Sequence, residues 1–463
     1  MEKFDAIIIG TGQAGPSLAA RLVDAGMKIA VIERKLFGGT CVNTGCVPTK
    51  TLIASAYAAK TVRRAAEFGV RLQGEAIVDM KAVKARKDAI SGRSRTGVEQ
   101  WMKGLKSCTV YQGHAQFLSP GEIVVGDEVL TAEKIFINVG GRASVPPFPG
   151  LEEVEYLTNS SMMDVDFLPD HLMIIGGSYV GLEFAQIYRR FGAQVTVIEK
   201  SSRIIGREDP EVSDTVAEIL HGEGIAIETS AECMRVEKRA VDGEMQIAVG
   251  VDCAGGSREA VGSHLLLAVG RVPNTEDLGL DRAGIATDAR GYITVDDRLQ
   301  TNVPGIWAIG DCNGRGAFTH TSYNDYEIVA DNILNGDTRS VADRIVAYGL
   351  FVDPPLGRVG MTDTEIRKSG RRALTGKRMM TRVGRATEKH ETLGFMKITV
   401  DADTKEILGA SFLGTSGDEA IHCVLDAMYA KAPYTVLQRA IHIHPTVAEF
   451  IPTILGDLVP LSP

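Results

Sequence analysis

The 463-residue sequence has no long apolar run and no excess of basic residues. It contains 50 Lys and Arg against 59 Asp and Glu, and this net charge of −9 disfavours binding to nucleic acid or to an anionic membrane. Because no apolar stretch has the length of a membrane-spanning helix, we expect no membrane association. A strand is predicted almost from the first residue, so we expect no secretory signal and a cytoplasmic location.

Cysteine is scarce and mostly scattered. The seven cysteines are an odd number, which fits a reducing compartment in which one pair is catalytic. No second pair has zinc-finger spacing, and we predict no metal site. Outside the single close pair the cysteines are Cys108, Cys233, Cys253, Cys312 and Cys423.

The close pair is Cys41 and Cys46, separated by four residues and followed by Pro48 and Lys50. This pattern predicts the start of a helix, in which nearly one turn would bring the two sulfurs within disulfide reach. A helix N-terminus and a nearby cation both lower the pKa of a thiol, and the thiolate is the reactive form. Two buried free cysteines, or half of a metal site, are the alternatives for such a pair taken alone.

A dinucleotide-binding pattern precedes the pair. Residues 4–9 predict a short strand that is apolar on both faces, a helix follows, and residues 28–32 predict a second strand that ends at Glu33. Glycines between the first strand and the helix let the backbone approach a pyrophosphate at the helix N-terminus, and Glu33 would accept a hydrogen bond from a ribose hydroxyl. The glycines are Gly10, Gly12 and Gly15.

A second pattern of the same kind lies at mid-chain. Its strands are predicted at residues 171–175 and 194–198, and Glu199 is the acidic residue. The loop between strand and helix contains Gly176, Ser178 and Gly181, with Ser178 at the position of the middle glycine. Two patterns predict two dinucleotides, most simply FAD at the first and a nicotinamide cofactor at the second. Glu199 favours NADH because a carboxylate repels a 2′-phosphate, while the neighbouring Lys200 and Arg203 leave NADPH as the alternative.

Three further segments complete a resemblance. Residues 268–274 resemble the segment that follows a nicotinamide-binding domain, and residues 306–311 resemble a second flavin motif in which Asp311 holds the ribityl chain. Residues 442–446 with Glu449 resemble a C-terminal acid–base dyad. Together with the cysteine pair, these motifs resemble, from end to end, the pyridine nucleotide–disulfide oxidoreductases, a family of flavoprotein disulfide reductases.

The resemblance implies an α/β fold with two Rossmann-like dinucleotide-binding domains and a C-terminal α/β dimerisation domain. We expect the first part of the FAD domain at residues 1–145, the NAD(P) domain at 146–270, the second FAD part at 271–345 and the dimerisation domain at 346–463. The stretch 54–104 is expected to be helical. Further residues expected at the cofactors are Arg34, Gly39, Thr40, Ala115, Gly141 and Gly270.

The resemblance also implies roles at the reacting centre. Cys46 would be the thiol beside the flavin, and Cys41 the thiol that exchanges with the substrate. His444, oriented by Glu449, would protonate the departing thiolate, and in the family this dyad comes from the partner subunit of a homodimer.

Three other residues are expected near the flavin. Lys50 and Glu183 resemble an ion pair near the ring, which, like Cys46, would contact the cofactor. Tyr179 matches a ring that covers the flavin in some members, with simple packing as the alternative.

The motifs determine the electron acceptor less closely than they determine the cofactors. The leading hypothesis is a dihydrolipoamide-dehydrogenase-like enzyme that passes electrons from NAD(P)H through FAD to the Cys41–Cys46 disulfide and on to a small disulfide. The alternative is a mercuric-reductase-like stress enzyme that reduces Hg(II), Cu(II) or hypothiocyanous acid. Thr44 and the segment 318–322 depart from the usual dehydrogenase sequence, and no cysteine follows Cys423 to receive mercury. A nonenzymatic assembly subunit is disfavoured by the intact cysteine pair and dyad.

Overall fold

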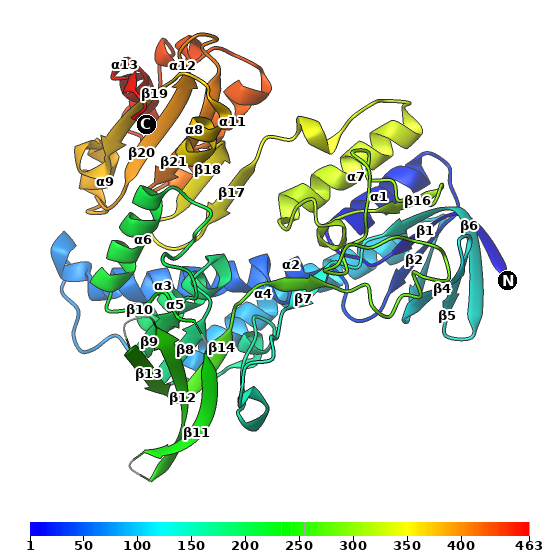
Figure 1. Ribbon diagram of the computed structural model, residues 1–463, viewed down its shortest axis with the longest axis horizontal. Helices are drawn as coiled ribbons and strands as arrows, with labels where there is room; N and C mark the ends of the chain where they lie inside the picture. Colours follow the sequence, from blue (N-terminus) through cyan, green and yellow to red (C-terminus); the bar gives the residue numbers. More distant parts are fainter. Residues whose placement is uncertain (233, 242, 254–255, 463) are drawn as a thin grey trace.

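The computed structural model describes residues 1–232, 234–241, 243–253 and 256–462. Figure 1 shows three lobes, with the N-terminus in the lobe at the right and the C-terminus in the lobe at the upper left. Among the described residues, no helix combines the length and the apolar character that crossing a bilayer requires.

The first lobe is built on a seven-stranded sheet of order β3-β2-β1-β6-β5-β4, with β16 paired to the later part of β6. Residues 6–9 of β1 are buried, as expected for a strand that is apolar on both faces. The strands are β1 (Glu2–Ile9), β2 (Ile29–Glu33), β3 (Cys108–Gln112), β4 (Ala115–Ser119), β5 (Glu122–Val125), β6 (Glu128–Ile137) and β16 (Ile306–Ala308). The first four along the order are parallel, and β5 and β4 add an antiparallel edge.

The α-helices of this lobe are α1 (Ala14–Asp24), α2 (Gly39–Asn43), α3 (Cys46–Arg63), α4 (Met80–Gly104) and α7 (Thr319–Leu334). Two of them, α3 and α4, also contact the second lobe. The expectation that 54–104 is helical is confirmed for residues 54–63 and 80–104 but not for the segment between them. Helix α3 ends at Arg63, a short 3-10 turn covers Ala65–Phe68, and no regular helix forms again before Met80. Gly69, which adopts φ +77°, a left-handed conformation that favours glycine, ends the 3-10 turn.

The second lobe has a parallel sheet of order β10-β9-β8-β14 and a three-stranded antiparallel sheet, β11-β12-β13. The strands are β8 (His171–Ile175), β9 (Gln194–Ile198), β10 (Ala226–Glu228), β11 (Arg235–Val241), β12 (Glu244–Cys253), β13 (Gly256–Gly262) and β14 (His264–Leu267). Its helices are α5 (Tyr179–Phe191) and α6 (Pro210–Gly222). A two-stranded ribbon of β7 (Gly141–Ala143) and β15 (Arg271–Pro273) joins the lobe to the first sheet.

The C-terminal lobe is a six-stranded antiparallel sheet of order β17-β18-β21-β20-β19-β22. Its strands are β17 (Ala347–Leu350), β18 (Leu356–Gly360), β19 (Ala373–Met379), β20 (Phe395–Asp401), β21 (Ile407–Leu413) and β22 (Val459–Pro460). Its helices are α8 (Asp363–Ser369), α9 (Gly384–Glu388), α10 (Gly417–Ala420), α11 (His422–Tyr429), α12 (Thr435–Gln438) and α13 (Ile451–Gly456).

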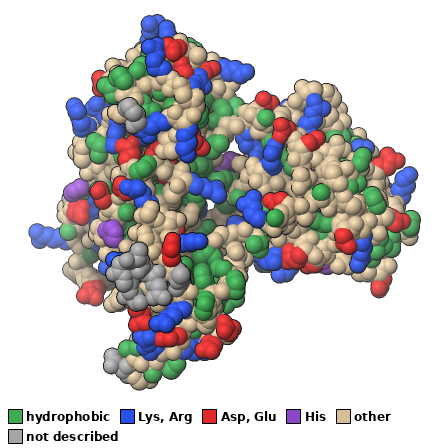
Figure 2. Space-filling view, viewed as in Figure 1, with side chains coloured by type: hydrophobic (Ala, Val, Ile, Leu, Met, Phe, Trp, Pro, Cys, Tyr) green, Lys and Arg blue, Asp and Glu red, His purple; other side chains and the backbone are tan. Residues whose placement is uncertain are grey.

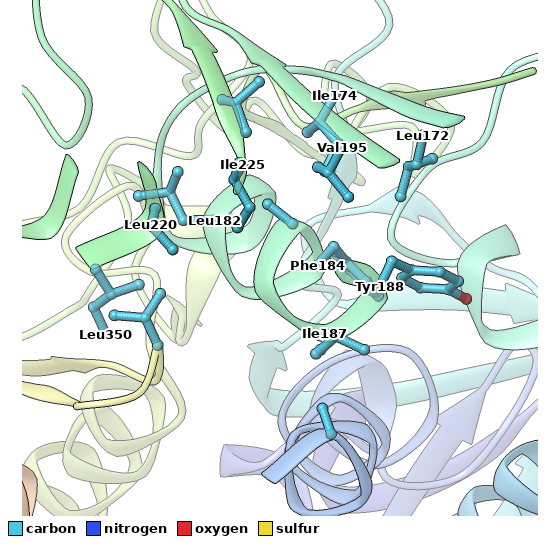
Figure 3. Packing of buried hydrophobic residues seen from close by; sticks show 14 of the residues in the cluster. Leu172, Ile174, Leu182, Phe184, Ile187, Tyr188, Val195, Leu220, Ile225 and Leu350 are labelled. Atoms are coloured by element: carbon cyan, nitrogen blue, oxygen red, sulfur yellow. The ribbon is translucent and has the colours of Figure 1, made fainter. Parts of the chain in front are cut away.

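One apolar core joins the second lobe to its neighbours. Figure 3 shows Leu172, Ile174 and Val195 of the parallel sheet facing Phe184 and Tyr188 of α5. The same cluster continues into α3 through Leu52 and Ala56, and into the C-terminal lobe through Leu350, Leu356, Phe395 and Leu413. Burial of apolar surface therefore fixes α3, and with it the first residue of that helix, between the lobes.

Candidate active site

The two cysteines lie on consecutive short segments rather than on one continuous turn. Cys41 is in α2 and Cys46 is the first residue of α3, because the chain leaves the helical conformation at Thr44. Gly45 allows the return: a Cβ at this position would lie 2.9 Å from the carbonyl oxygen of Thr40. The prediction of a single helical turn was therefore wrong, although the N-terminus of a helix is at Cys46 as expected.

The two thiols are not joined by a disulfide in this structure, and their pKa values differ. A hydrogen bond from the Cys41 thiol, followed by one from Thr319 and by the charge of Lys50, lowers the pKa of Cys46 to about 6, against the opposing effect of burial. The hydrogen bond to Cys46 and burial raise the pKa of Cys41 far above its usual range. The pair thus holds one thiolate, on Cys46, and one thiol, on Cys41.

The predicted ion pair forms beside the cysteines. Nζ of Lys50 lies 2.9 Å and 2.7 Å from the two carboxylate oxygens of Glu183, which is 6% exposed on α5. The backbone N–H of Phe351 also donates to Glu183, at 3.1 Å, and Nζ of Lys50 lies 4.3 Å from the centre of the Phe351 ring. Three lobes therefore contribute to this pair.

Tyr179 lies in an aromatic cluster at the same junction. Its ring contacts those of Phe318 and Tyr348 edge to face, with centroids 6.1 Å and 5.5 Å away. Burial raises the pKa of Tyr179 to about 12. The phenol is therefore neutral near pH 7, and the ring is held by neighbours from the first and C-terminal lobes.

Both predicted dinucleotide loops have the required shape. A Cβ at Gly15 would lie 2.4 Å from the oxygen of Gly10, and a Cβ at Gly181 would lie 2.0 Å from the oxygen of Gly176, so only glycine fits at each crossing. Neither the residue before α1 nor Ser178 before α5 caps its helix with a side chain. In α1 the N–H of Ala14 is left for a pyrophosphate, since that of Gly15 donates to Gly12 and Pro16 has none, and in α5 the N–H groups of the first turn are left in the same way. The residues present therefore fit FAD and a nicotinamide dinucleotide.

The acidic residues that end the two strands take equivalent positions. Glu33 accepts from the backbone N–H of Thr11 at 3.0 Å and from that of Lys35 at 2.7 Å. Glu199 accepts from the N–H groups of Gly177 and Ser201, both at 2.7 Å. Each carboxylate is thus held by the backbone at the edge of its loop.

Asp311 follows β16, which pairs with the later part of β6 in the first sheet. Burial raises the pKa of its carboxyl, and Nε of Arg271 forms an ion pair with it at 3.7 Å. Its carboxylate oxygens can also accept hydrogen bonds from the hydroxyls of a ribityl chain.

The remaining predicted cofactor residues lie around these loops. Gly39 and Thr40 begin α2, Ala115 begins β4 and is buried, Gly141 begins β7, and Gly270 directly precedes β15. Arg34 is instead paired with Asp277 at 2.8 Å. Sequence reasoning did not identify Asn138, whose side-chain amide donates to the carbonyls of Gly10 and Gly12, at 3.2 Å each.

The predicted acid–base dyad has the expected geometry but a distant location. Nδ1 of His444 lies 2.8 Å from Oε2 of Glu449, and the His444 side chain is 81% exposed. Figure 1 places the neighbouring α12 and α13 at the far end of the C-terminal lobe, well away from α2. One chain therefore does not bring His444 to Cys41.

Figure 2 shows a hollow between the C-terminal lobe and the lobe of the first sheet, on the side where Figure 1 labels α2.

A family model described as "Pyridine nucleotide-disulphide oxidoreductase" matches residues 4–325, and that of the family's dimerisation domain matches residues 346–454. The chain belongs to this family. The predicted family and α/β fold class are thereby confirmed.

The chain resembles individual family members over nearly its whole length. It is 36% identical to the "Probable pyridine nucleotide-disulfide oxidoreductase RclA" of Escherichia coli strain K12, over 97% of this chain and 98% of that protein. It is 33% identical to a dihydrolipoyl dehydrogenase of Thermus scotoductus, over 97% and 96% of the two chains. The solved Cu(II) complex of the HOCl-induced flavoprotein disulfide reductase RclA from Escherichia coli superposes with a TM-score of 0.89 at 34% identity, covering 98% of this chain and 99% of that one.

Membership of the family identifies the protein as a flavoprotein disulfide oxidoreductase that uses a pyridine nucleotide and carries a dimerisation domain. Among the described residues, no group of three or more His, Cys, Asp or Glu side chains has an arrangement that could hold a metal ion.

Proposed function

We propose that Cys41 and Cys46 form the redox-active pair of this oxidoreductase and reduce a small oxidised acceptor. The observation that carries the proposal is the asymmetry of the pair, with a thiolate at Cys46 and a protonated thiol at Cys41. The loop that begins α1 would hold FAD, which would supply the electron pair, drawn from the nicotinamide cofactor, for opening the Cys41–Cys46 disulfide. Lys50 and Glu183 would lie beside this exchange, and Cys41 would face the acceptor.

The loops that begin α1 and α5 would hold the two dinucleotides through the N–H of Ala14 and those of the first turn of α5, which no side chain caps. Asp311 and Glu33 would accept hydrogen bonds from FAD, and Tyr179 would cover the nicotinamide side. At the second loop we propose a preference for NADH. Glu199 is anchored by two backbone N–H groups, and Arg203 is engaged by Asp214 at 3.0 Å, which leaves less positive charge for a 2′-phosphate.

The His444–Glu449 dyad would serve the Cys41 of a second copy in a homodimer. Within one chain the dyad lies away from α2, and its imidazole is exposed. Two apolar neighbours on the same loop, Ile441 and Ile443, are 101% and 80% exposed, which is unusual for large apolar side chains and fits burial against a partner.

We propose a small stress-related oxidant, such as hypothiocyanous acid or Cu(II), as the acceptor. The relatives named RclA support this class, since one is described as HOCl-induced and was solved with Cu(II). Within this chain, Thr319 places a hydroxyl 3.2 Å from the Cys46 sulfur, in the segment that departs from the usual dehydrogenase sequence. A dihydrolipoamide-dehydrogenase-like activity is the second candidate, favoured by the likeness to the Thermus scotoductus enzyme.

Acceptor-dependent oxidation of NADH and NADPH by the flavin-loaded protein tests both candidates. Lipoamide, oxidised glutathione, Hg(II), Cu(II) and hypothiocyanous acid are compared, with Cys41→Ser as the matched control for nonspecific flavin oxidation. Fast turnover of lipoamide alone would replace the stress-oxidant proposal by the dehydrogenase one. Turnover of every acceptor at an unchanged rate in Cys41→Ser would overturn the dithiol mechanism altogether.

A further inference from the structure

We propose that Thr319 is the hydroxyl donor that keeps Cys46 in its thiolate form while Cys41 is covalently bonded to the acceptor. The inference rests on the proposed dithiol function and deepens it by assigning a residue to one stage of the cycle. Thr319 is 273 positions from Cys46 in the sequence, yet its Oγ1 lies 3.2 Å from the Cys46 sulfur.

The position of Thr319 is determined by the start of α7. Thr319 is the first residue of this 16-residue helix, and the preceding Phe318 has an extended backbone. The hydroxyl of Thr321 bonds both the N–H of Phe318, at 3.1 Å, and its carbonyl, at 2.7 Å, which fixes the first turn. The Cys46 sulfur therefore lies between the N-terminus of its own helix and that of α7, and both helix dipoles favour a negative charge there.

The nearby ion pair contributes little net charge to this sulfur. Lys50 donates to both carboxylate oxygens of Glu183, and while Lys50 favours the thiolate, Glu183 opposes it. The direct hydrogen-bond donors to the sulfur are then the Cys41 thiol and the Thr319 hydroxyl. The charged or titratable groups that act on Cys46 thus come from α2, α3 and α5, and Thr319 adds an uncharged donor from α7.

The donor from Cys41 is lost during turnover. With a disulfide acceptor RS–SR′, the Cys41 thiol passes its proton to the His444 that the second copy would supply, and the Cys41 sulfur attacks one sulfur of the acceptor. A Cys41–SR bond forms, the S–S bond breaks, and R′S⁻ leaves and takes that proton from His444. The Cys46 thiolate then attacks the sulfur of Cys41, the Cys41–Cys46 bond forms, and RS⁻ leaves. Two electrons pass from the dithiol to the acceptor. Between the two attacks Cys41 has no S–H, so Thr319 is the side chain that still donates to Cys46.

A Cys41→Ala variant lacks the Cys41 S–H donor, as the mixed disulfide does, and allows Cys46 to be studied without an acceptor. In the flavin-loaded Cys41→Ala protein, the rate of Cys46 alkylation by iodoacetamide is followed against pH through the mass of the Cys46 peptide. Adding Thr319→Val is expected to raise the midpoint by about one pH unit, because a hydrogen bond to a charged group is lost. Thr319→Ser on the same background should restore the midpoint.

Two comparisons make the result specific. Thr51→Val removes a hydroxyl from the same helix as Cys46, but that hydroxyl donates to the carbonyl of Val47, so this variant should leave the midpoint unchanged. With Cys41 intact, Thr319→Val should shift the midpoint less, because the Cys41 thiol still donates.

An unmoved midpoint in Cys41→Ala/Thr319→Val, or an equal shift from Thr51→Val, would overturn the assignment. If the valine variant does not fold, Thr319→Ala must show the same rise. The measurement uses no acceptor, so failure of the proposed dithiol function, seen as normal turnover in Cys41→Ala, remains a separate outcome.

Discussion

Nδ1 of His444 lies 2.8 Å from Oε2 of Glu449 in the segment between α12 and α13, two helices that Figure 1 shows at the end of the C-terminal lobe away from α2. The carboxylate orients an imidazole that faces solvent within its own chain. A histidine positioned in this way can protonate a leaving thiolate only if another molecule brings one to it.

Replacing His444 should separate the two halves of the reaction. We expect His444→Ala to lower acceptor reduction by about 10²–10⁴-fold, the usual contribution of a general acid. Flavin reduction by NADH should change little, because the dyad is distant from α5. Stopped-flow measurement of each half-reaction tests this expectation, and an equal slowing of both would assign the proton transfer elsewhere.

A shared active site predicts complementation between two inactive variants. In a heterodimer of Cys41→Ser and His444→Ala, one site carries both changes and the other carries neither. After unfolding and refolding of a 1:1 mixture, about one quarter of all sites would be intact if the chains pair at random. Recovery of about that fraction of wild-type activity is expected, whereas no recovery would show that each chain uses its own dyad.

The thiolate of the reduced protein should titrate near pH 6. Because the pKa of Cys46 is lowered to about 6, the thiolate fraction rises as the pH passes from 5 to 7, while Cys41 stays protonated to much higher pH. Thiolate absorbance near 240 nm, with the Cys46→Ser variant subtracted, should show one step in this range. A single step near pH 9 would contradict the asymmetry of the pair.

The second and C-terminal lobes are joined by a buried cation. Lys397 is 4% exposed on β20, and it pairs with Asp363 at 2.8 Å and with Glu211, the second residue of α6. Lys397→Met should lower the free energy of unfolding by about 3–5 kcal/mol, because it leaves buried carboxylates unpaired. Lys377 also pairs with Glu211, at 2.7 Å, but it is 39% exposed. Lys377→Met is therefore the control, with an expected loss of at most about 1 kcal/mol in urea denaturation.

Gly181, where the second dinucleotide loop passes close to Gly176, should not accept a side chain. Gly181→Ala would place a Cβ 2.0 Å from the oxygen of Gly176, so the start of α5 must move. We expect weaker NADH binding and slower flavin reduction, with FAD content unchanged because the first loop is intact. Gly222→Ala, at the end of α6 with no atom within 4 Å of the added Cβ, should behave like wild type. Titration with NADH under anaerobic conditions measures both.

Local patterns in the chain were sufficient to predict the strands, the two glycine loops and the helix that begins at Cys46. These features depend on side-chain alternation, on close backbone crossings and on the start of a helix, all of which neighbouring residues control. The resemblance added the ion pair of Lys50 with Glu183 and the dyad of His444 with Glu449, and the structure brings each pair within hydrogen-bonding distance.

Tertiary structure decided which distant residues share a site. Thr319 reaches Cys46 because β16 and α7 return to the first sheet after the entire second lobe has been inserted, an arrangement that no local pattern specifies. The separation of His444 from Cys41 likewise follows from the packing of the C-terminal sheet against the second lobe. Sequence periodicity reports the burial of each element, whereas the partners of an element depend on the order of strands and on the packing of whole lobes.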